Sequence, residues 1–206
     1  MRSYIPQVSQ YLVEFDGSLK GVGIRINKLI EGVEVPWKVA RFVFPFDLDG
    51  DSSYQNTSEF IAVVLATGCL ISLNIRDVAV AARGDSKTAL TWSVTERFRN
   101  GPSKNATMCY MVLGIEHDIH FNQQEHIKGV DNVICDKLSR QYTPEELGFQ
   151  PEQIICVDGP LSRLLDLCNP LNKDFELGGK DFEAAWAGAF AISNELQMIG
   201  ENRDKI

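Results

Sequence analysis

The stretch that decides the fold is Tyr11-Leu-Val-Glu-Phe-Asp-Gly-Ser18, near the start of the chain. Every second side chain as far as Phe15 is aromatic or branched and apolar, which is the period-two pattern of a β-strand. The strand ends at Asp16, because Gly17 and Ser18 favour a turn. A carboxylate at the end of a buried strand is costly unless something positive, such as a metal ion, lies beside it. The stretch therefore predicts a strand that ends in a candidate metal ligand.

A second stretch, His126-Ile-Lys-Gly-Val-Asp-Asn-Val-Ile-Cys-Asp-Lys-Leu-Ser-Arg140, lies far along the chain. Its apolar residues recur at helical spacing and predict a helix from Asp131 to about Arg140. Asn132 and Asp136 are four residues apart, so they share one face of this helix. The stretch therefore predicts a helix that presents a second carboxylate, Asp136, toward a cleft.

Two further acids stand at predicted element boundaries. A helix is predicted from residue 56 to about residue 74, with Thr57 or Ser58 as its N-cap, which places Glu59 in the first turn. Asp85 follows a short apolar strand and precedes another helix. Each acid has an ordinary explanation by itself, because an acid in a first turn complements the helix dipole and an aspartate before a helix can cap it. Four carboxylates on four separate elements nevertheless indicate one acidic, metal-binding site.

The remaining pattern predicts a mixed α/β fold. Three consecutive strands with short links predict an antiparallel meander, and the later alternation of strands and helices adds two further strands. In such sheets ligands bind beyond the carboxyl ends of the strands, where Asp16 and Asp85 both lie. We therefore expect a five-stranded mixed sheet flanked by helices. The predicted strands are 11–16, 21–27, 35–46, 77–82 and 119–127, and the predicted helices are 56–74, 86–98, 104–118 and 131–140.

A change of composition at residues 142–150 predicts a boundary in the chain. We expect residues 1–141 to form the domain that carries the acids, and residues 142–206 to form a helical C-terminal extension. Leucines at helical spacing near residue 164 and an amphipathic pattern from Asp181 to Ile199 predict helices there. No residue pattern in this extension carries chemistry, so we expect it to pack on the domain or to contact a partner protein.

The composition is that of a soluble globular protein, with 206 residues, 44% of them apolar and 23% charged. No apolar run is long enough to span a bilayer, so no membrane partner is expected. The segment from Met1 to Gln10 lacks the apolar centre of a signal peptide. We therefore expect an intracellular protein, in the cytoplasm, nucleoid or nucleus, rather than a secreted one. Five cysteines without a Cys-x-x-Cys pair indicate reduced thiols.

The net charge of −8 bears on the class of partner. It counts against tight nucleic-acid binding by the chain alone, because such binding relies on Lys and Arg displacing counterions from phosphates. Bound divalent ions can supply positive charge locally, so an acidic chain is still compatible with a nucleic-acid enzyme. The charge therefore lowers the expectation of a nucleic-acid function without excluding it.

The order of the predicted elements and the four acidic motifs resemble the ribonuclease H family. The resemblance covers Gln10 to Arg140, about two-thirds of the chain. The last motif, with the preceding His126-Ile-Lys-Gly129, is most similar to the ribonuclease H domains attached to reverse transcriptases of retroelements. The matching motifs are Phe15-Asp-Gly-Ser18, Gln55-Asn-Thr-Ser-Glu59, Gly84-Asp-Ser86 and Asn132-Val-Ile-Cys-Asp-Lys-Leu-Ser-Arg140.

The resemblance implies a metal-dependent nuclease on a ribonuclease H-like fold. In the family, four acids hold two Mg²⁺ ions, for which Mn²⁺ can substitute, and the enzyme cuts the RNA strand of an RNA–DNA hybrid. On this basis the catalytic metal ligands are Asp16, Glu59, Asp85 and Asp136, with Asp16 bridging both ions. Hydrolysis would leave a 5′-phosphate and a 3′-hydroxyl.

The resemblance also implies contacts with the nucleic acid. Gln55 and Asn56 match the family's amide pair before the catalytic glutamate, which is placed to read a minor groove and its 2′-hydroxyl groups. Ser86 and Asn132 match polar positions that contact the substrate. The substrate-binding residues expected from the resemblance are Gly17, Ser18, Gln55, Asn56, Ser86 and Asn132.

Two features depart from the family pattern. Many members carry a mobile His in a longer loop before the final helix, whereas here only His126 stands nearby, at a strand end. His126 is the candidate for that catalytic role, and the alternative is a structural or substrate-facing His. The family's basic helix is absent, and only Arg97, Arg99 and Lys104 flank the turn in its place. Family domains without this helix often depend on a polymerase, so we expect a polymerase or reverse transcriptase as a partner and weak activity in isolation.

Two alternatives stay open. The same fold and acidic cluster also serve nucleases and resolvases that cut DNA, so a DNA-strand endonuclease is the nearest alternative. A non-catalytic ribonuclease H-like scaffold or interaction domain is more distant. In a scaffold, four facing carboxylates without a metal would repel one another, raise some of their pKa values and cost stability. The complete set of four acids therefore favours an enzyme.

Overall fold

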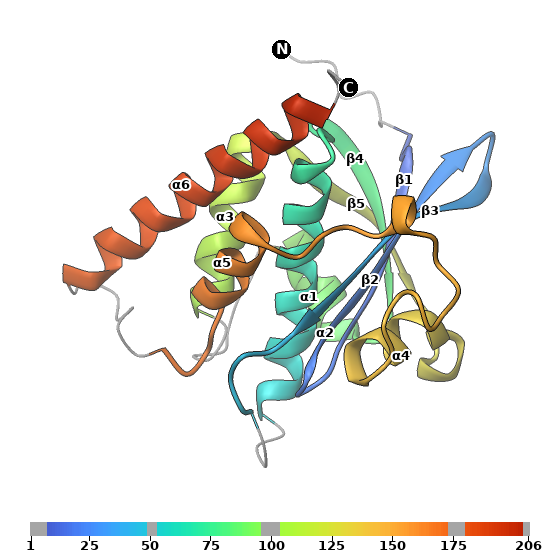
Figure 1. Cartoon of the computed structure of the whole chain (residues 1–206), viewed down its shortest axis with the longest axis horizontal. Helices are drawn as coiled ribbons and strands as arrows, with labels where there is room; N and C mark the ends of the chain where they lie inside the picture. The colour runs from blue at the N-terminus through green and yellow to red at the C-terminus, as the bar shows by residue number, and fades with distance from the viewer. Residues whose placement is uncertain (1–7, 49–52, 96–103, 173–179, 204–206) are drawn as a thin grey trace.

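The computed structural model describes residues 8–48, 53–95, 104–172 and 180–203. A twisted sheet runs through the molecule with helices against both of its faces (Figure 1). Arg97 and Arg99, which the sequence places at the reduced basic turn, lie outside the described residues. Within those ranges, none of the helices is both long enough and apolar enough to cross a bilayer.

The sheet has five strands in the order β3-β2-β1-β4-β5. The strand β1 lies in the middle, antiparallel to β2 and parallel to β4, while β3 and β5 form the two edges. This confirms the predicted five-stranded mixed sheet with an antiparallel meander of the first three strands. The strands are β1 Tyr11–Gly17, β2 Gly21–Ile30, β3 Val33–Val43, β4 Val78–Gly84 and β5 Ile119–His126.

The hairpin between β2 and β3 is longer than the sequence predicted. The second strand was expected to end at Asn27, but it runs on to Ile30 and turns back within two residues. Glu31 and Gly32 both have positive φ values, 52° and 80°. Two consecutive left-handed residues match the right-handed twist of a hairpin, and Asn-Gly is their usual signature. Here Glu31 stands in place of the usual Asn, so the sequence does not show the expected turn pair.

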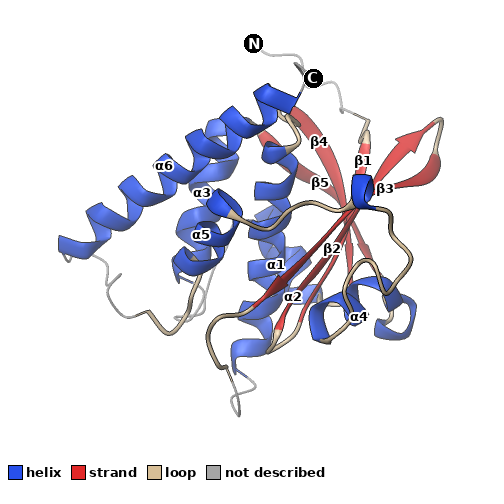
Figure 2. Ribbon diagram, viewed as in Figure 1, coloured by secondary structure: helices blue, strands red, loops and turns tan. Residues whose placement is uncertain are grey.

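The helices cover the two faces of the sheet unequally. Figure 2 shows α1, α3, α5 and α6 on one side of the sheet and α4 on the other. Contacts of α1 with β1 and β2, and of α4 with the same two strands, agree with this arrangement. Short 3₁₀ turns, η2 (Gly129–Asp131) and η3 (Pro151–Gln153), precede α4 and α5 respectively. The helices are α1 Ser53–Ser72, α2 Lys87–Thr95, α3 Lys104–His117, α4 Val133–Arg140, α5 Gly159–Leu167 and α6 Lys180–Arg203.

The centre of the core is α1, which is buried on nearly every side after its first turn. The predicted core residues Phe60, Val64 and Ile71 are buried as expected. The helix is apolar all round because the sheet covers one side and α3, α5 and α6 cover the other. Gly68 lets the covering helices approach, since a Cβ there would meet Leu164 Cδ2 at 2.7 Å.

The C-terminal extension is helical and shares this core. Both α5 and α6 contact α1 and α3, and they contribute buried side chains such as Leu164 and Leu196. The His117 ring lies 2.8 Å from Ser193 Oγ, a buried hydrogen bond between α3 and α6. The division of the chain at residue 141 into two domains stays a prediction.

Candidate active site

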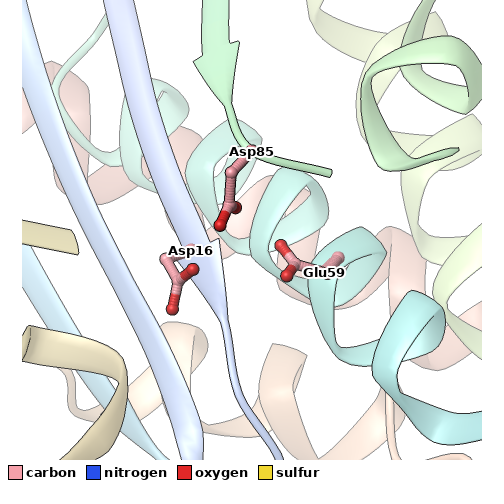
Figure 3. A group of neighbouring side chains, drawn as sticks. All are labelled: Asp16, Glu59 and Asp85. Atoms are coloured by element: carbon pink, nitrogen blue, oxygen red, sulfur yellow. The ribbon is translucent and has the colours of Figure 1, made fainter. Parts of the chain in front are cut away.

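Three carboxylates from three separate elements meet at the carboxyl end of the central strand β1. Asp16 is near the end of β1, Glu59 lies in α1, and Asp85 directly follows β4. One carboxylate oxygen from each residue lies within 4.8 Å of the others. Figure 3 shows the three side chains directed toward one another. The sheet brings Asp16 and Asp85 together because β1 and β4 are parallel neighbours, so their carboxyl ends lie side by side.

Glu59 is held against the end of β1 by backbone and amide groups. The Gly17 N–H donates to Glu59 Oε2 at 3.2 Å, and Gln55 Nε2 donates to Glu59 Oε1 at 3.1 Å. Gln55 Nε2 also donates to the Gly17 carbonyl at 2.7 Å. Only glycine permits this approach of strand and helix, because a Cβ at Gly17 would lie 2.4 Å from the Ser58 carbonyl carbon.

Glu59 does not lie in the first turn of its helix, so it is not there to complement the helix dipole. The first turn of α1 begins at Ser53 and holds no acid, so Glu59 lies beyond it. Thr57 and Ser58, the predicted N-caps, are likewise inside the helix, where the Ser58 hydroxyl donates to the Tyr54 carbonyl at 2.9 Å. The acid therefore does not serve the helix dipole, and its carboxylate faces the other two.

Asp85 brings an unsatisfied oxygen to the cluster. Its Oδ1 is buried and, within the part of the chain that the structure describes, has no hydrogen-bond partner. Ser86 takes the capping role that Asp85 could have had, because its Oγ accepts the Ala89 N–H at 3.2 Å. A buried, unpaired carboxylate oxygen is costly in a protein, and a cation is the group that would pair with it.

The fourth predicted acid, Asp136, lies beside the cluster rather than in it. Its side chain is 40% exposed, and its Oδ1 accepts a hydrogen bond from Arg140 Nε at 2.6 Å, four residues further along α4. Its charge is close enough to contribute to the raised pKa of Asp16. The structure thus brings three of the four acids together and places the fourth at the margin, in an ion pair.

Ser139 is a site residue that the sequence reasoning missed. Its buried hydroxyl donates to Asp16 Oδ2 and also lies 2.9 Å from the Asp136 carbonyl. Its own carbonyl accepts the Ser18 hydroxyl at 2.8 Å. The available signal was its spacing of three residues from Asp136, which places both on neighbouring positions of one helix face. Ser139 therefore fixes the orientation of the Asp16 carboxylate, although the two residues are 123 positions apart in the sequence.

The other predicted residues divide into buried and exposed groups. The Ser18 hydroxyl is engaged inside the protein, and buried Asn132 donates from Nδ2 to the Phe15 carbonyl at 3.0 Å, which ties the start of α4 to β1. Asn56 is exposed near the start of α1. His126 is exposed at the end of β5, with Nε2 3.0 Å from the Asp85 carbonyl oxygen.

Burial and mutual repulsion shift the proton affinities of the cluster. Burial is the main cause that raises the pKa of Glu59 to about 8, followed by the charges of Asp16 and Asp85. Burial also raises the pKa of Asp16 to about 6 against the opposing hydrogen bond from Ser139, and the charges of Asp85 and Asp136 add to it. The expected repulsion is thus present, but removal from water contributes more.

The residues present fit a hard divalent cation. Asp16, Glu59 and Asp85 offer only carboxylate oxygens, the ligand type that Mg²⁺ takes in proteins. Asp85 Oδ1 is unpaired, and burial together with mutual repulsion raises the pKa values of Asp16 and Glu59, so a cation would stabilise the charged form of all three acids. These three side chains would hold the ion.

Comparisons with known proteins give a weak structural likeness. No protein-family model matches the chain, and no curated protein matches it. LC11-RNase H1, isolated from compost by a metagenomic approach, is 16% identical with a TM-score of 0.46, over 64% of this chain and 93% of that one. LC11-RNase H1 in complex with an RNA/DNA hybrid gives 15% identity and a TM-score of 0.43, over 62% and 92%. A similarity of this extent assigns no activity to the chain.

Proposed function

We propose that the chain is a metal-dependent endonuclease of the ribonuclease H type, which hydrolyses the RNA strand of RNA–DNA hybrids. The observation that carries the proposal is the cluster of Asp16, Glu59 and Asp85 at the carboxyl ends of two parallel strands. Two of these acids are buried with raised pKa values, and the third has an unpaired oxygen. An arrangement that costs stability when empty is expected where a bound cation serves a reaction.

The cluster suits phosphodiester hydrolysis. A pair of bound Mg²⁺ or Mn²⁺ ions would supply an activated water and stabilise the leaving 3′ oxygen. Ser139 fixes the orientation of Asp16, which would hold both ions. Glu59, Asp85 and Asp136 would complete the ligand set. The expected products are a 5′-phosphate and a 3′-hydroxyl.

Three polar residues around the cluster, Gln55, Asn56 and His126, are assigned separate roles. Asn56 is exposed one residue from Gln55, so we assign Asn56 to the minor groove and its 2′-hydroxyl groups. Gln55 reaches the Gly17 carbonyl and Glu59, so its first role is to hold that acid. His126 stands exposed beside Asp85, where an imidazole can assist the release of product.

The finer parts of the proposal rest on the sequence. The stretch from His126 to Arg140 supports a kinship with the ribonuclease H domains of reverse transcriptases, and a polymerase as the partner that holds the hybrid. The net charge of −8 supports weak binding of nucleic acid by the chain alone.

The test combines metal binding with cleavage. Thermal melting of the intact chain is measured in chelator, Mg²⁺ and Mn²⁺, and the same samples are incubated with labelled RNA–DNA hybrid, duplex DNA and single strands. We expect the metals to raise the melting temperature, as a ligand specific to the folded state must, and only the RNA of the hybrid to be cut. Asp85→Asn should lose both effects, whereas Glu195→Gln, in an exposed ion pair with Arg163, should keep both.

The alternatives predict different results. Hydrolysis of DNA alone would replace the proposal with a DNA-cutting nuclease or resolvase of the same fold. A chain that neither binds the metals nor cuts any of these substrates would be a scaffold, and the proposal would be wrong.

A further inference from the structure

Arg140 pairs with Asp136 beside the acidic cluster, and the proposed mechanism leaves it without a role. Its Nε donates to Asp136 Oδ1 at 2.6 Å, and its side chain is 61% exposed. The negative charges of Asp136, Asp16 and Asp85 all contribute to a raised pKa of Arg140. Its guanidinium therefore lies in the field of Asp16 and Asp85 as well as beside its partner.

Asp136 lies in this ion pair and outside the three-acid cluster. The helix itself is already docked there, because Ser139 bonds Asp16 Oδ2 and lies 2.9 Å from the Asp136 carbonyl. The Asp136 backbone is thus joined to Asp16 through a single hydroxyl group. With α4 held in this way, a turn of the Asp136 side chain rather than a movement of the helix is the step by which the fourth carboxylate would approach the other three.

The pair is weak enough to be exchanged. Ion pairs between exposed side chains at spacing i,i+4 contribute only a few tenths of a kcal/mol. A guanidinium carries five N–H donors in a planar fork that matches the oxygens of a phosphate, and the bond to Asp136 uses one of them. A phosphodiester at the cluster would therefore compete well for Arg140.

We propose that Arg140 is a positioning residue, which restrains Asp136 in the free protein and exchanges it for a phosphodiester oxygen of the substrate. Asp136 then turns to the cluster and becomes the fourth metal ligand. The exchange couples two events, because the fourth ligand arrives only when a nucleic-acid strand lies across the site. This inference rests on the proposed function and adds an order to its binding steps.

The first test measures metal binding without substrate. The melting temperature of the intact chain is followed as Mg²⁺ is titrated into wild type, Arg140→Gln, Asp136→Asn and the double variant. Because the restraint is worth no more than an exposed ion pair, we expect Arg140→Gln to lower the Mg²⁺ midpoint by roughly twofold beyond the effect of the lost charge. The substitution should have a smaller effect in the Asp136→Asn background, since no carboxylate is left to release and only the lost charge acts there.

Two controls separate restraint from simple charge. Arg140→Lys keeps the positive charge but lacks the fork, and we expect a smaller shift in the same direction. Arg163→Gln breaks an exposed Arg–Glu pair between α5 and α6, away from the cluster, and should leave the midpoint unchanged. A shift by Arg140→Gln of the same size in the Asp136→Asn background would be general electrostatics and would overturn the proposal. An unchanged midpoint would overturn it too.

The second test measures the substrate. With RNA–DNA hybrid and saturating Mg²⁺, Arg140→Gln should raise KM several-fold with little change in kcat, because the phosphodiester contact is lost while Asp136 is free. An unchanged KM would overturn the exchange with phosphate. These failures differ from failure of the proposed function, in which wild type itself neither binds Mg²⁺ nor cuts the hybrid.

Discussion

The Ser139 hydroxyl donates a hydrogen bond to Asp16 Oδ2 and so joins the last turn of α4 to the end of β1. Both side chains are buried, and the bond lowers the pKa of Asp16 against the larger effect of burial. The orientation of the first acid of the site thus depends on a residue 123 positions away in the sequence.

Replacing Ser139 by alanine leaves a buried carboxylate without its donor. We expect the free energy of unfolding to fall by about 1–3 kcal/mol at pH 8 in chelator. The loss should be smaller at pH 5, because the pKa of Asp16 is about 6 and the carboxyl group is then protonated. Urea denaturation at the two pH values measures the difference.

Ser72→Ala is the matched control for this prediction. Ser72 is also a buried helical serine, and its hydroxyl donates to the carbonyl three residues earlier, at Cys69. It has the local contact of Ser139 without the carboxylate, so its cost should not depend on pH. Equal pH dependence in the two variants would contradict the role given to Ser139.

The metal-free protein should lose stability as the pH rises. The pKa of Glu59 is about 8 in the folded chain against an ordinary value of 4.5, so the folded state binds this proton more tightly than the unfolded state. Its contribution is complete below about pH 4.5 and is lost as the pH rises toward 8. Because each tenfold difference in proton affinity between the two states is worth about 1.4 kcal/mol, the loss is a few kcal/mol.

Urea denaturation in chelator between pH 5 and pH 8.5 tests this dependence. Glu59→Gln removes the titrating group, so its profile should be much flatter than that of wild type. Saturating Mg²⁺ should flatten the wild-type profile as well, because a cation replaces the proton. A wild-type profile that rises with pH in chelator would show that the carboxylate is not destabilised.

Gly17→Ala should damage both the fold and the site. An added Cβ would lie 2.4 Å from the backbone of Ser58, in the contact that holds Glu59. We expect a loss of about 1–3 kcal/mol, as for other overpacked sites, and a lower Mg²⁺ affinity. Gly114→Ala is the control, since nothing lies within 4 Å of its added Cβ in α3 and alanine favours a helix by about 1 kcal/mol. Equal effects of the two substitutions would contradict the packing argument.

The extension should contribute to the stability of the whole chain. Leu196 of α6 is fully buried against the core, so Leu196→Ala should cost about 2–5 kcal/mol in urea denaturation. Met198, 61% exposed on the same helix, is the control, and Met198→Ala should cost much less.

A chain that ends at Gln141 should be less stable than either variant. A truncated chain as stable as wild type would show that residues 142–206 form a separate unit.

Much of the architecture follows from local pattern. Alternating apolar residues predict the strands, and the carboxyl ends of β1 and β4 bring Asp16 and Asp85 together without any knowledge of side-chain contacts. The start of α1 was placed too late, because Thr57 and Ser58 look like caps although they lie inside the helix. The sequence pattern shows no difference between a serine before a helix and one within it.

The details of the site depend on tertiary contacts that spacing does not encode. The i,i+4 relation of Asp136 and Arg140 is visible in the sequence, but the position of this acid outside the cluster is not. The spacing of Ser139 from Asp136 places both on one helix face, but it does not identify Asp16 as the partner of Ser139. That contact forms only because α4 docks on the sheet. Long-range hydrogen bonds of this kind follow from the packed structure rather than from local preference.

The middle position of β1 has a consequence for heat inactivation. Its amide groups are bonded to β2 on one side and β4 on the other, so hydrogen exchange along this strand should require opening of most of the molecule. The backbone beneath Asp16 would then be among the last parts to loosen on warming. Activity lost below the unfolding temperature would begin at α4, which carries Ser139 and Asp136 and is only eight residues long.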